Sequence, residues 1–152
     1  MSTATNTRPD KLSIIVFSGD FVRIHYALVT ASAAVAIDIP VTLFFTMAAS
    51  RALLAPHADG TPAWRSLPVG DSGALGATAD QVDDGFKSRT VADFEDLLGA
   101  CVSLGVRFMV CDMGLRALDM EGVHLRDDVA IESGGMVTFL NDASASGQML
   151  FI

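Results

Sequence analysis

Cys111 is the residue whose type and position most clearly suggest chemistry. It follows the short apolar run 106–110 and is followed at once by Asp112, Met113 and Gly114. The pattern predicts a buried strand that turns directly into a helix, and ligands of parallel α/β sheets collect at such strand ends. A thiol beside a helix N-terminus is favoured as the nucleophilic thiolate, whereas the adjacent Asp112 carboxylate opposes that ionisation. We therefore expect a partly exposed, reactive thiol.

A structural interpretation of Cys111 stays open beside the chemical one. Free cysteines are among the residue types most often buried, so this side chain could simply fill the core. Cys101 stands ten positions earlier on the apolar side of a predicted helix, and for this possible secondary thiol the structural interpretation is the stronger one. Two cysteines at this spacing do not form the dense disulfide framework of a small secreted protein.

A second loop with polar residues, Ser18-Gly19-Asp20, follows another apolar run. Its glycine and the free amides of a helix start could hold an anion, but one glycine without a lysine favours a plain turn capped by Asp20. His25 has no second metal-type residue at helical spacing, so we expect a surface or rim histidine and no metal site. We also expect no cofactor. The residues expected around an anion or ligand pocket are Ser18, Gly19, Asp20, Met47, Asp112, Met113 and Gly114.

The elements that must position these residues alternate between strand and helix patterns. Predicted strands cover 12–17, 41–46, 106–110, 129–131 and 148–152. Predicted helices cover 21–37, 47–54, 90–104, 113–118 and 134–142, with Asp20, Thr90, Asp112 and Ser133 as candidate N-caps and Asp93 as the third helical residue after Thr90. The alternation predicts a single α/β domain with a mostly parallel sheet and helices on both faces.

The predicted domain covers 11–152, after a mobile tail at 1–10, and contains one atypical segment. Residues 55–89 hold five glycines, three prolines, the only tryptophan and an acidic cluster around Asp80. A segment of this length is usually functional or mobile, so we expect a lid or an oligomer contact with a helical turn near 80–86. Trp64 within it could cap a pocket or anchor the loop. With 51% hydrophobic residues, Trp64 and Leu67 also suggest an apolar patch and self-association.

The composition excludes several classes of partner. A formal net charge of −8 argues against non-specific nucleic-acid binding and against anionic membrane surfaces. The apolar stretch 26–49 is about as long as a membrane span, but Asp38 and Pro40 interrupt it, and a helix followed by a buried strand explains it better. No signal-peptide pattern opens the sequence, so we expect a cytoplasmic protein without membrane insertion.

Taken together, four segments resemble DsrE/DsrF-like sulfur-transfer proteins, especially the stand-alone DsrE-like subgroup often labelled as peroxiredoxin family proteins. They are Ile-Ile-Val-Phe-Ser-Gly-Asp at 14–20, Val-Thr-Leu-Phe-Phe-Thr at 41–46, Leu-Gly-Val-Arg-Phe-Met-Val-Cys-Asp-Met at 104–113 and Gly-Gly-Met-Val-Thr-Phe-Leu at 134–140. The resemblance extends over 11–152. It implies a flavodoxin-like three-layer α/β/α sandwich, frequent homo-oligomers, and sulfur carried as a cysteine persulfide.

The same resemblance assigns roles to individual residues. The cysteine that follows the family's third strand corresponds to Cys111, and Cys101 occupies the neighbourhood of a second cysteine found in related proteins. The sequence departs from the family pattern at two places, and both bear on the expected ligand or partner more than on the sulfur chemistry. Met47-Ala48-Ala49 stands where the subgroup has an aromatic-rich segment, and Cys-Asp-Met-Gly replaces the family's Cys-x-Met-Ser.

Three hypotheses follow for function. The first is a sulfur carrier or sulfurtransferase using Cys111, with donor and acceptor proteins or small thiols as partners. The second is a non-catalytic binding or assembly module that kept the fold without the chemistry, which a thiol titration would distinguish. The third is a thiol redox protein using Cys101 and Cys111, which a reversible internal disulfide would support.

Overall fold

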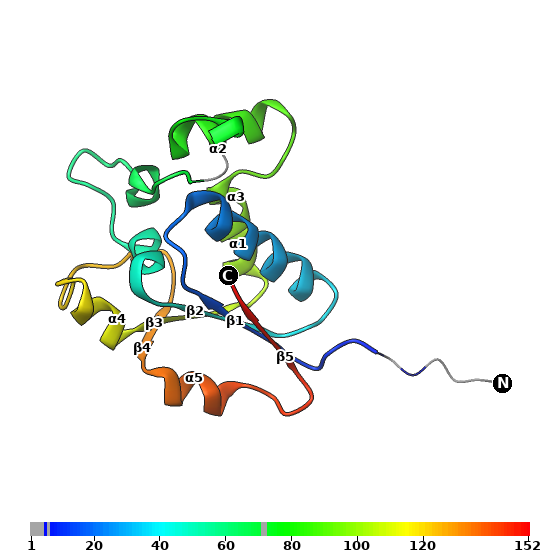
Figure 1. The fold of residues 1–152 in the computed structure, drawn as a ribbon. Coiled ribbons are helices and arrows are strands. Elements are labelled where there is room, and N and C mark those ends of the chain that lie inside the picture. Colours follow the sequence, from blue (N-terminus) through cyan, green and yellow to red (C-terminus); the bar gives the residue numbers. More distant parts are fainter. Residues whose placement is uncertain (1–4, 6, 71–72) are drawn as a thin grey trace.

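Five parallel strands form one sheet at the centre of the protein (Figure 1). The computed structural model describes residue 5 and residues 7–70 and 73–152, so the first part of the tail expected over 1–10 lies outside the described residues. The strands are β1 Leu12–Val16, β2 Val41–Phe45, β3 Arg107–Cys111, β4 Ile131–Gly134 and β5 Gln148–Phe151, in the order β4-β3-β2-β1-β5. The predicted parallel α/β fold is confirmed, and four of the five strands lie within two residues of their expected positions.

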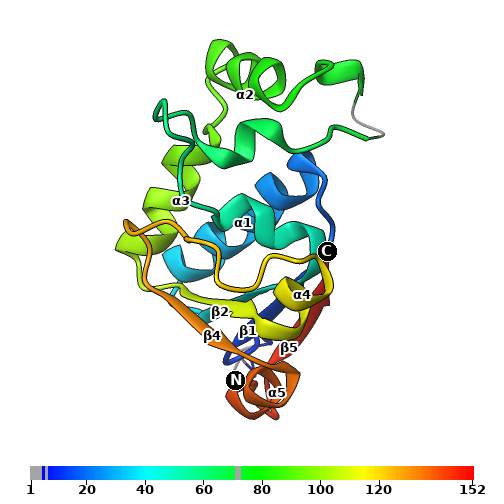
Figure 2. The same ribbon diagram turned by 90° about the vertical axis from the view of Figure 1, so that its left-hand side faces the viewer.

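Helices cover the two faces of the sheet unequally (Figures 1 and 2). The long helices α1 Phe21–Ala36 and α3 Phe94–Ser103 pack against each other on one face, and the short α5 Met136–Asp142 lies on the other. This arrangement follows from right-handed crossovers. The chain moves steadily outward from β1 to β4 along one face, and it must then cross the opposite face to place β5 beside β1.

The core divides into separate clusters because strand side chains alternate between the two faces. Ile14, Leu43 and Phe108 belong to the large cluster with α1 and α3. Ile15 and Phe44 belong to a small cluster on the α5 face. Every residue of β1 and β2 is buried, as expected for parallel strands covered on both sides. In the part of the chain that the structure describes, no helix is both long and apolar enough to cross a membrane.

Of the four predicted N-caps, one is confirmed and three need correction. Asp20 caps α1 as predicted, because its carboxylate accepts hydrogen bonds from the amides of Val22 and Arg23. The prediction for Thr90 is wrong: it lies in the left-handed region at φ 59°, and Asp93 caps α3 by accepting from the Asp96 amide. Aspartate caps helices at least as well as threonine, and Asp93 stands directly before Phe94, the buried first residue of α3.

The starts of the two short helices also differ from prediction. Ser133 does not cap a helix but belongs to β4, and α5 begins after Gly135 without a side-chain cap. Strand β4 therefore begins later than the strand expected over 129–131. Asp112 is not the cap of α4 Asp112–Ala117 but its first residue, and Cys111 occupies the N-cap position. Both differences arise because strand and helix here meet with almost no loop between them.

The segment 55–89 is largely folded. It contains the 3-10 helices η2 Ala63–Ser66 and η3 Gly73–Leu75 and the helix α2 Ala79–Ser88, which is longer than the turn expected near 80–86. It follows η1 Met47–Leu53, a 3-10 helix where an α-helix is predicted. Trp64 anchors the segment: it is 2% exposed, stacks on Phe94 at 4.8 Å between ring centroids, and donates to Glu95 at 2.8 Å.

Candidate functional site

The carboxyl ends of β3 and β4 form the point where neighbouring connections leave toward opposite faces of the sheet (Figure 2). After β3 the chain enters α4, whose Leu115 packs with Val110. After β4 the chain enters α5, whose Phe139 belongs to the cluster on the other face. Such a divergence opens the crevice in which parallel α/β proteins usually bind their ligands. Cys111 is the last residue of β3 and therefore stands at this point.

The thiol of Cys111 accepts a hydrogen bond from the backbone N–H of Gly114 at 3.4 Å. This N–H group belongs to the first turn of α4 and points at the sulfur atom. The residue is nevertheless only 2% exposed, so the expectation of a partly exposed thiol is wrong. Its side chain points to the α5 face, where it shares a buried cluster with Ile15, Phe44, Met109 and Phe139.

Gly114 allows α4 to pack directly against the end of β2. A Cβ atom added there would lie 2.7 Å from the Met47 amide nitrogen and 2.9 Å from Thr46 Oγ1. Met47 itself has the left-handed backbone value φ 50°, which is uncommon for a residue with a side chain. Because Gly114 has no side chain, α4 can approach η1 this closely, and the turn holds the Gly114 N–H against the Cys111 sulfur.

The loop Ser18-Gly19-Asp20 joins the same region through the residues after β2. A Cβ atom on Gly19 would lie 2.7 Å from the Ala48 side chain, so this loop packs closely on η1. The Asp20 carboxylate is occupied by three amides, from Val22, Arg23 and Gly70. The first amides of α1 therefore already have an acceptor, and the geometry matches a plain turn better than an anion cradle.

Asp112 and Met113 face different surroundings. The Asp112 carboxylate accepts a hydrogen bond from the Ser133 hydroxyl, which ties the start of α4 to β4. Met113 is 68% exposed. The structure thus brings Met47 and Gly114 together beside Cys111, with Gly19 packed next to them on Ala48, while Asp112 turns to Ser133 and Met113 is open to solvent.

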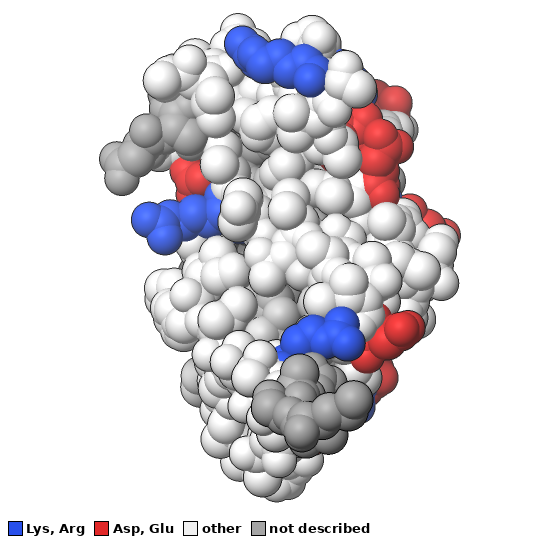
Figure 3. All heavy atoms as spheres, turned by 90° about the vertical axis from the view of Figure 1, so that its right-hand side faces the viewer, with Lys and Arg blue, Asp and Glu red and all other residues white. Residues whose placement is uncertain are grey.

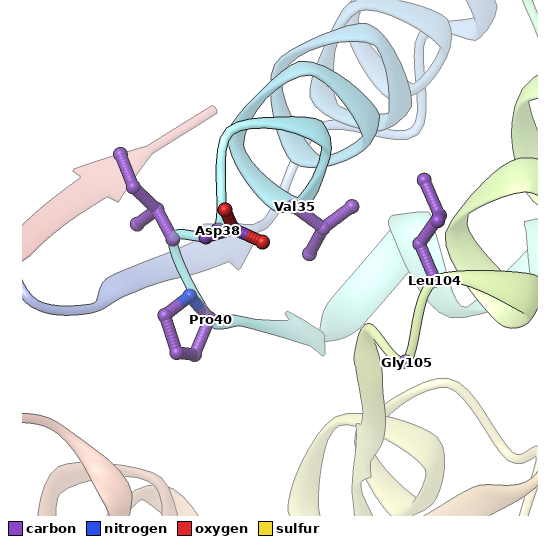
Figure 4. A pocket seen from close by; sticks show the side chains of 6 residues that line it. Val35, Asp38, Pro40, Leu104 and Gly105 are labelled. Carbon is purple, nitrogen blue, oxygen red and sulfur yellow. The ribbon is translucent and has the colours of Figure 1, made fainter.

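Among the cavities that the described residues form near strand ends, two bear on the site, and neither is lined by Cys111. One, of about 430 Å³, is lined by Val110, Asp112, Leu115, Arg116, Glu121, Gly122, Val123, Leu125 and Ser133. Because successive strand residues point to opposite faces, its wall residue Val110 and the Cys111 thiol lie on different sides of β3. The other, of about 260 Å³, lies at the amino ends of β2 and β3, between Val35, Asp38, Pro40 and the Leu104-Gly105 turn (Figure 4).

Cys101 is fully buried in α3, as predicted, and its thiol donates to the Leu28 carbonyl at 3.6 Å. Burial raises the pKa of the Cys101 thiol to about 11, so it stays protonated near neutral pH. It belongs to the large cluster on the α1–α3 face, whereas Cys111 belongs to the cluster on the α5 face. The sheet therefore separates the two thiols.

A partly buried carboxylate that the sequence does not indicate fixes the far end of α5. Asp142 accepts from Lys11 Nζ at 2.7 Å and from Thr42 Oγ1 at 2.5 Å, and it pairs with Arg107. Burial raises the pKa of Asp142, but these three donors outweigh it and hold the pKa below its usual value. The partners come from three distant parts of the sequence, so no local pattern could have revealed the cluster.

His25 is also misplaced by the sequence-based expectation. It is not a surface or rim residue but is 4% exposed, with Nε2 2.9 Å from the Ala92 carbonyl and its ring 4.4 Å from that of Phe86. Burial lowers its pKa, and the Ala92 bond and the Asp83 charge offset this only in part. Among the residues that the structure describes, no three His, Cys, Asp or Glu side chains are grouped to hold a metal ion.

Comparison with known proteins agrees with the architecture. The fold is similar to the crystal structure of the ychN protein from E. coli, with a TM-score of 0.54 and 15% sequence identity over 93% of this chain and 98% of that one. No curated protein matches the sequence. The model of the DsrE/DsrF/DrsH-like family matches residues 8–151, almost the whole chain. This protein, with its flavodoxin-like sheet and a cysteine at the end of β3, belongs to the DsrE/DsrF/DrsH-like family.

Proposed function

We propose that this protein is a sulfur carrier that holds sulfane sulfur as a persulfide on Cys111. The observation that carries the proposal is the position of the thiol at the β3–β4 divergence, where it accepts the Gly114 N–H at 3.4 Å. The same donor lies against the sulfur atom that would carry negative charge as the attacking and the leaving thiolate. Membership of a family associated with sulfur relay supports the same chemistry.

The transfer proceeds in two thiol exchange steps that leave the overall redox state unchanged. The Cys111 thiolate attacks the outer sulfur of a donor persulfide, a new S–S bond forms, and the donor's own S–S bond breaks to release a donor thiolate. An acceptor thiolate then attacks the outer sulfur now held on Cys111. The acceptor leaves with that sulfur, and Cys111 returns to the thiolate form.

Cys101 is not proposed to take part in this exchange. Its raised pKa of about 11 leaves little thiolate near neutral pH, and the sheet separates it from Cys111. The same separation argues against the thiol redox hypothesis, because a disulfide requires Cα atoms within about 7 Å of each other. The chain therefore has one candidate thiol for sulfur and no partner thiol beside it.

Incubation with a small persulfide donor tests the proposal. We expect intact-protein mass spectrometry to show the addition of one sulfur atom, which a reductant such as dithiothreitol removes. Peptide mapping should place that atom on Cys111. A native protein that gains no sulfur, or gains it only on Cys101, would contradict the carrier function.

The burial of Cys111 favours one competing function, a binding or assembly module that has lost the chemistry. A thiol that is 2% exposed cannot be reached unless the structure around it opens. If Cys111 resists both the persulfide donor and an alkylating reagent under native conditions, the module hypothesis replaces the carrier.

We also propose that the carrier self-associates, though not through the residues first expected. Trp64 and Leu67 are 2% and 5% exposed, so the prediction of an apolar patch from them is wrong. A different set of apolar side chains is exposed beside α5 and β5, and we term it the α5–β5 surface: Phe17, Met136, Val137, Leu140, Met149 and Phe151.

The residues of the α5–β5 surface lie on one face of the sheet. The Phe17 and Phe151 rings lie 5.3 Å apart, and the β1–β5 register turns Met149 and Phe151 to the face that α5 partly covers. On α5, Thr138 lies against Gly134 of β4, so Met136 and Leu140 project from the opposite flank at 3.6 residues per turn. Apolar side chains of α5 and of β5 are thus exposed on the same face of the sheet.

A second copy of this chain is the occupant that fits the α5–β5 surface. The six side chains of this surface expose an accessible area on the order of 600 Å² per copy. Each partner in a standard interface contributes about 800 Å², so the six supply a large share of it. None of the six is charged in a chain of net charge −8, so two copies can meet here without like-charge repulsion. Figure 3, which faces the β5 edge, shows broad areas without charged residues.

The two edge strands of the sheet differ, and the difference also favours a second copy of this chain as the partner at the α5–β5 surface. At one edge, β4 carries Glu132, paired with Arg107, and a charge of this kind protects an open edge from pairing. At the other edge, β5 has the sequence Gln-Met-Leu-Phe, without charge or proline. Such an edge offers unpaired backbone groups and apolar side chains, and a second copy of this chain can cover both.

Single aspartate substitutions test the interface. We expect light scattering to show a dimer or larger oligomer for the wild type at micromolar concentration. Val137→Asp or Phe151→Asp should shift it to monomer, because an unpaired charge would be buried. Val91→Asp is the matched control, since Val91 is 44% exposed and lies outside the surface. A monomeric wild type, or an oligomer insensitive to both substitutions, would contradict this interface.

A further inference from the structure

One short helix contributes to the buried cluster that contains Cys111. Three of the four residues that share its buried cluster, Ile15, Phe44 and Met109, lie on the sheet itself. The fourth is Phe139 of α5, which is fully buried and stacks on Phe44 with 4.9 Å between ring centroids. Of the helices in the described ranges, α5 is the one that contributes a side chain to this cluster.

The two ends of α5 are held very differently. At the carboxyl end, Asp142 is bound by Lys11, Thr42 and Arg107, which come from three separate segments. At the amino end, Gly135 occupies the cap position without a side-chain hydrogen bond. This weakly held end is also the end nearest the thiol, because Gly134 is the register partner of Cys111.

Within one copy of the chain, little buried surface holds the amino end of α5 in place. Phe139 is the single buried residue of the helix, while Val137 beside it is 73% exposed. Segments with few buried contacts open locally far more often than the whole protein unfolds. Two consecutive glycines, Gly134 and Gly135, precede the helix and give its first turn freedom to move.

We propose that α5 is a hinged cover, fixed at Asp142 and opening at Gly135, and that Phe139 controls access to the Cys111 thiol. The geometry of the cover does not depend on sulfur chemistry, whereas its purpose rests on the proposed carrier function. Phe139 acts as a positioning residue. When its ring lies on Phe44 the thiol is closed off, and when the helix lifts, the thiol meets solvent.

The rate of alkylation of Cys111 by iodoacetamide in the native protein tests the cover. Wild type should react slowly, and Phe139→Ala should react at least tenfold faster. Phe139→Leu keeps an apolar side chain over the thiol and should restore a rate close to that of wild type. Phe108→Ala is the matched control: Phe108 is 2% exposed and stacks on Phe45, but it lies on the other face of the sheet. This control should not reproduce the increase.

A second variant tests the hinge even if Phe139→Ala fails to fold. A Cβ atom on Gly135 would meet nothing within 4 Å, and the residue has φ −110°, which alanine accepts without strain. Gly135→Ala should therefore fold normally, stiffen the start of α5 and slow alkylation about two- to threefold. An unchanged or faster rate would count against opening at this point.

Other outcomes overturn the cover or the carrier separately. If Phe139→Ala and Phe108→Ala accelerate alkylation equally, the thiol is reached through global unfolding and the cover is refuted. It is refuted as well if wild-type Cys111 reacts as fast as it does in the denatured chain. If alkylation depends on Phe139 but persulfide never loads on Cys111, the cover stands and the carrier function fails.

Discussion

Cys111→Ala is expected to abolish sulfur loading completely, whereas Cys101→Ser is expected to load one sulfur atom as the wild type does. The first substitution removes the only thiol placed at the β3–β4 divergence. The second changes a thiol that burial keeps protonated, since the pKa of Cys101 is raised to about 11. Intact-protein mass spectrometry after incubation with a persulfide donor measures both variants directly.

The stability of the two variants must be measured beside their loading. Cys111 is buried in a small apolar cluster, so its replacement by alanine leaves a cavity and costs about 1 kcal/mol. Cys101→Ser places a hydroxyl in the core at a cost of about 1–2 kcal/mol, which a hydrogen bond to the Leu28 carbonyl partly offsets. Loading by a folded Cys111→Ala variant would refute the assignment. A stable Cys101→Ser variant that fails to load would give Cys101 a catalytic role.

The sheet could be predicted from sequence because its information is local. Continuous apolar runs mark β1, β2 and β3 as strands buried on both faces, and Gly105 marks the end of the helix before β3. The position of Cys111 at a strand end follows from the same runs. The order of the strands then follows largely from the handedness of the crossovers, which physical chemistry fixes in advance.

The exposure of Cys111 could not be predicted because it depends on distant segments. Cys111 shares its buried cluster with Phe44 and Phe139, which no spacing rule connects to it. The same applies to His25, whose partner carbonyl belongs to Ala92. The predicted patch at Trp64 and Leu67 is absent because an aromatic or aliphatic residue in a glycine-rich segment anchors that segment as readily as it forms a patch.

Gly114→Ala is expected to destabilise the protein by about 1–3 kcal/mol, through overpacking at the turn that carries the thiol. The new methyl group would lie 2.7 Å from the Met47 amide nitrogen, and a backbone atom cannot move aside as the end of a flexible side chain can. Either α4 or η1 must therefore shift. Since the N–H of Gly114 is the donor to Cys111 Sγ, the shift should also lower sulfur loading.

Gly99→Ala provides the control for this prediction, because the same chemical change is made where space is free. Gly99 lies on the exposed side of α3, and an added Cβ atom would meet nothing within 4 Å. Alanine should stabilise that helix by roughly 0.5–1 kcal/mol and leave loading unchanged. Thermal or denaturant unfolding of the two variants should therefore move in opposite directions from wild type. If Gly114→Ala unfolds like Gly99→Ala, the close approach of α4 to η1 is wrong, and with it the geometry that holds an amide on the sulfur.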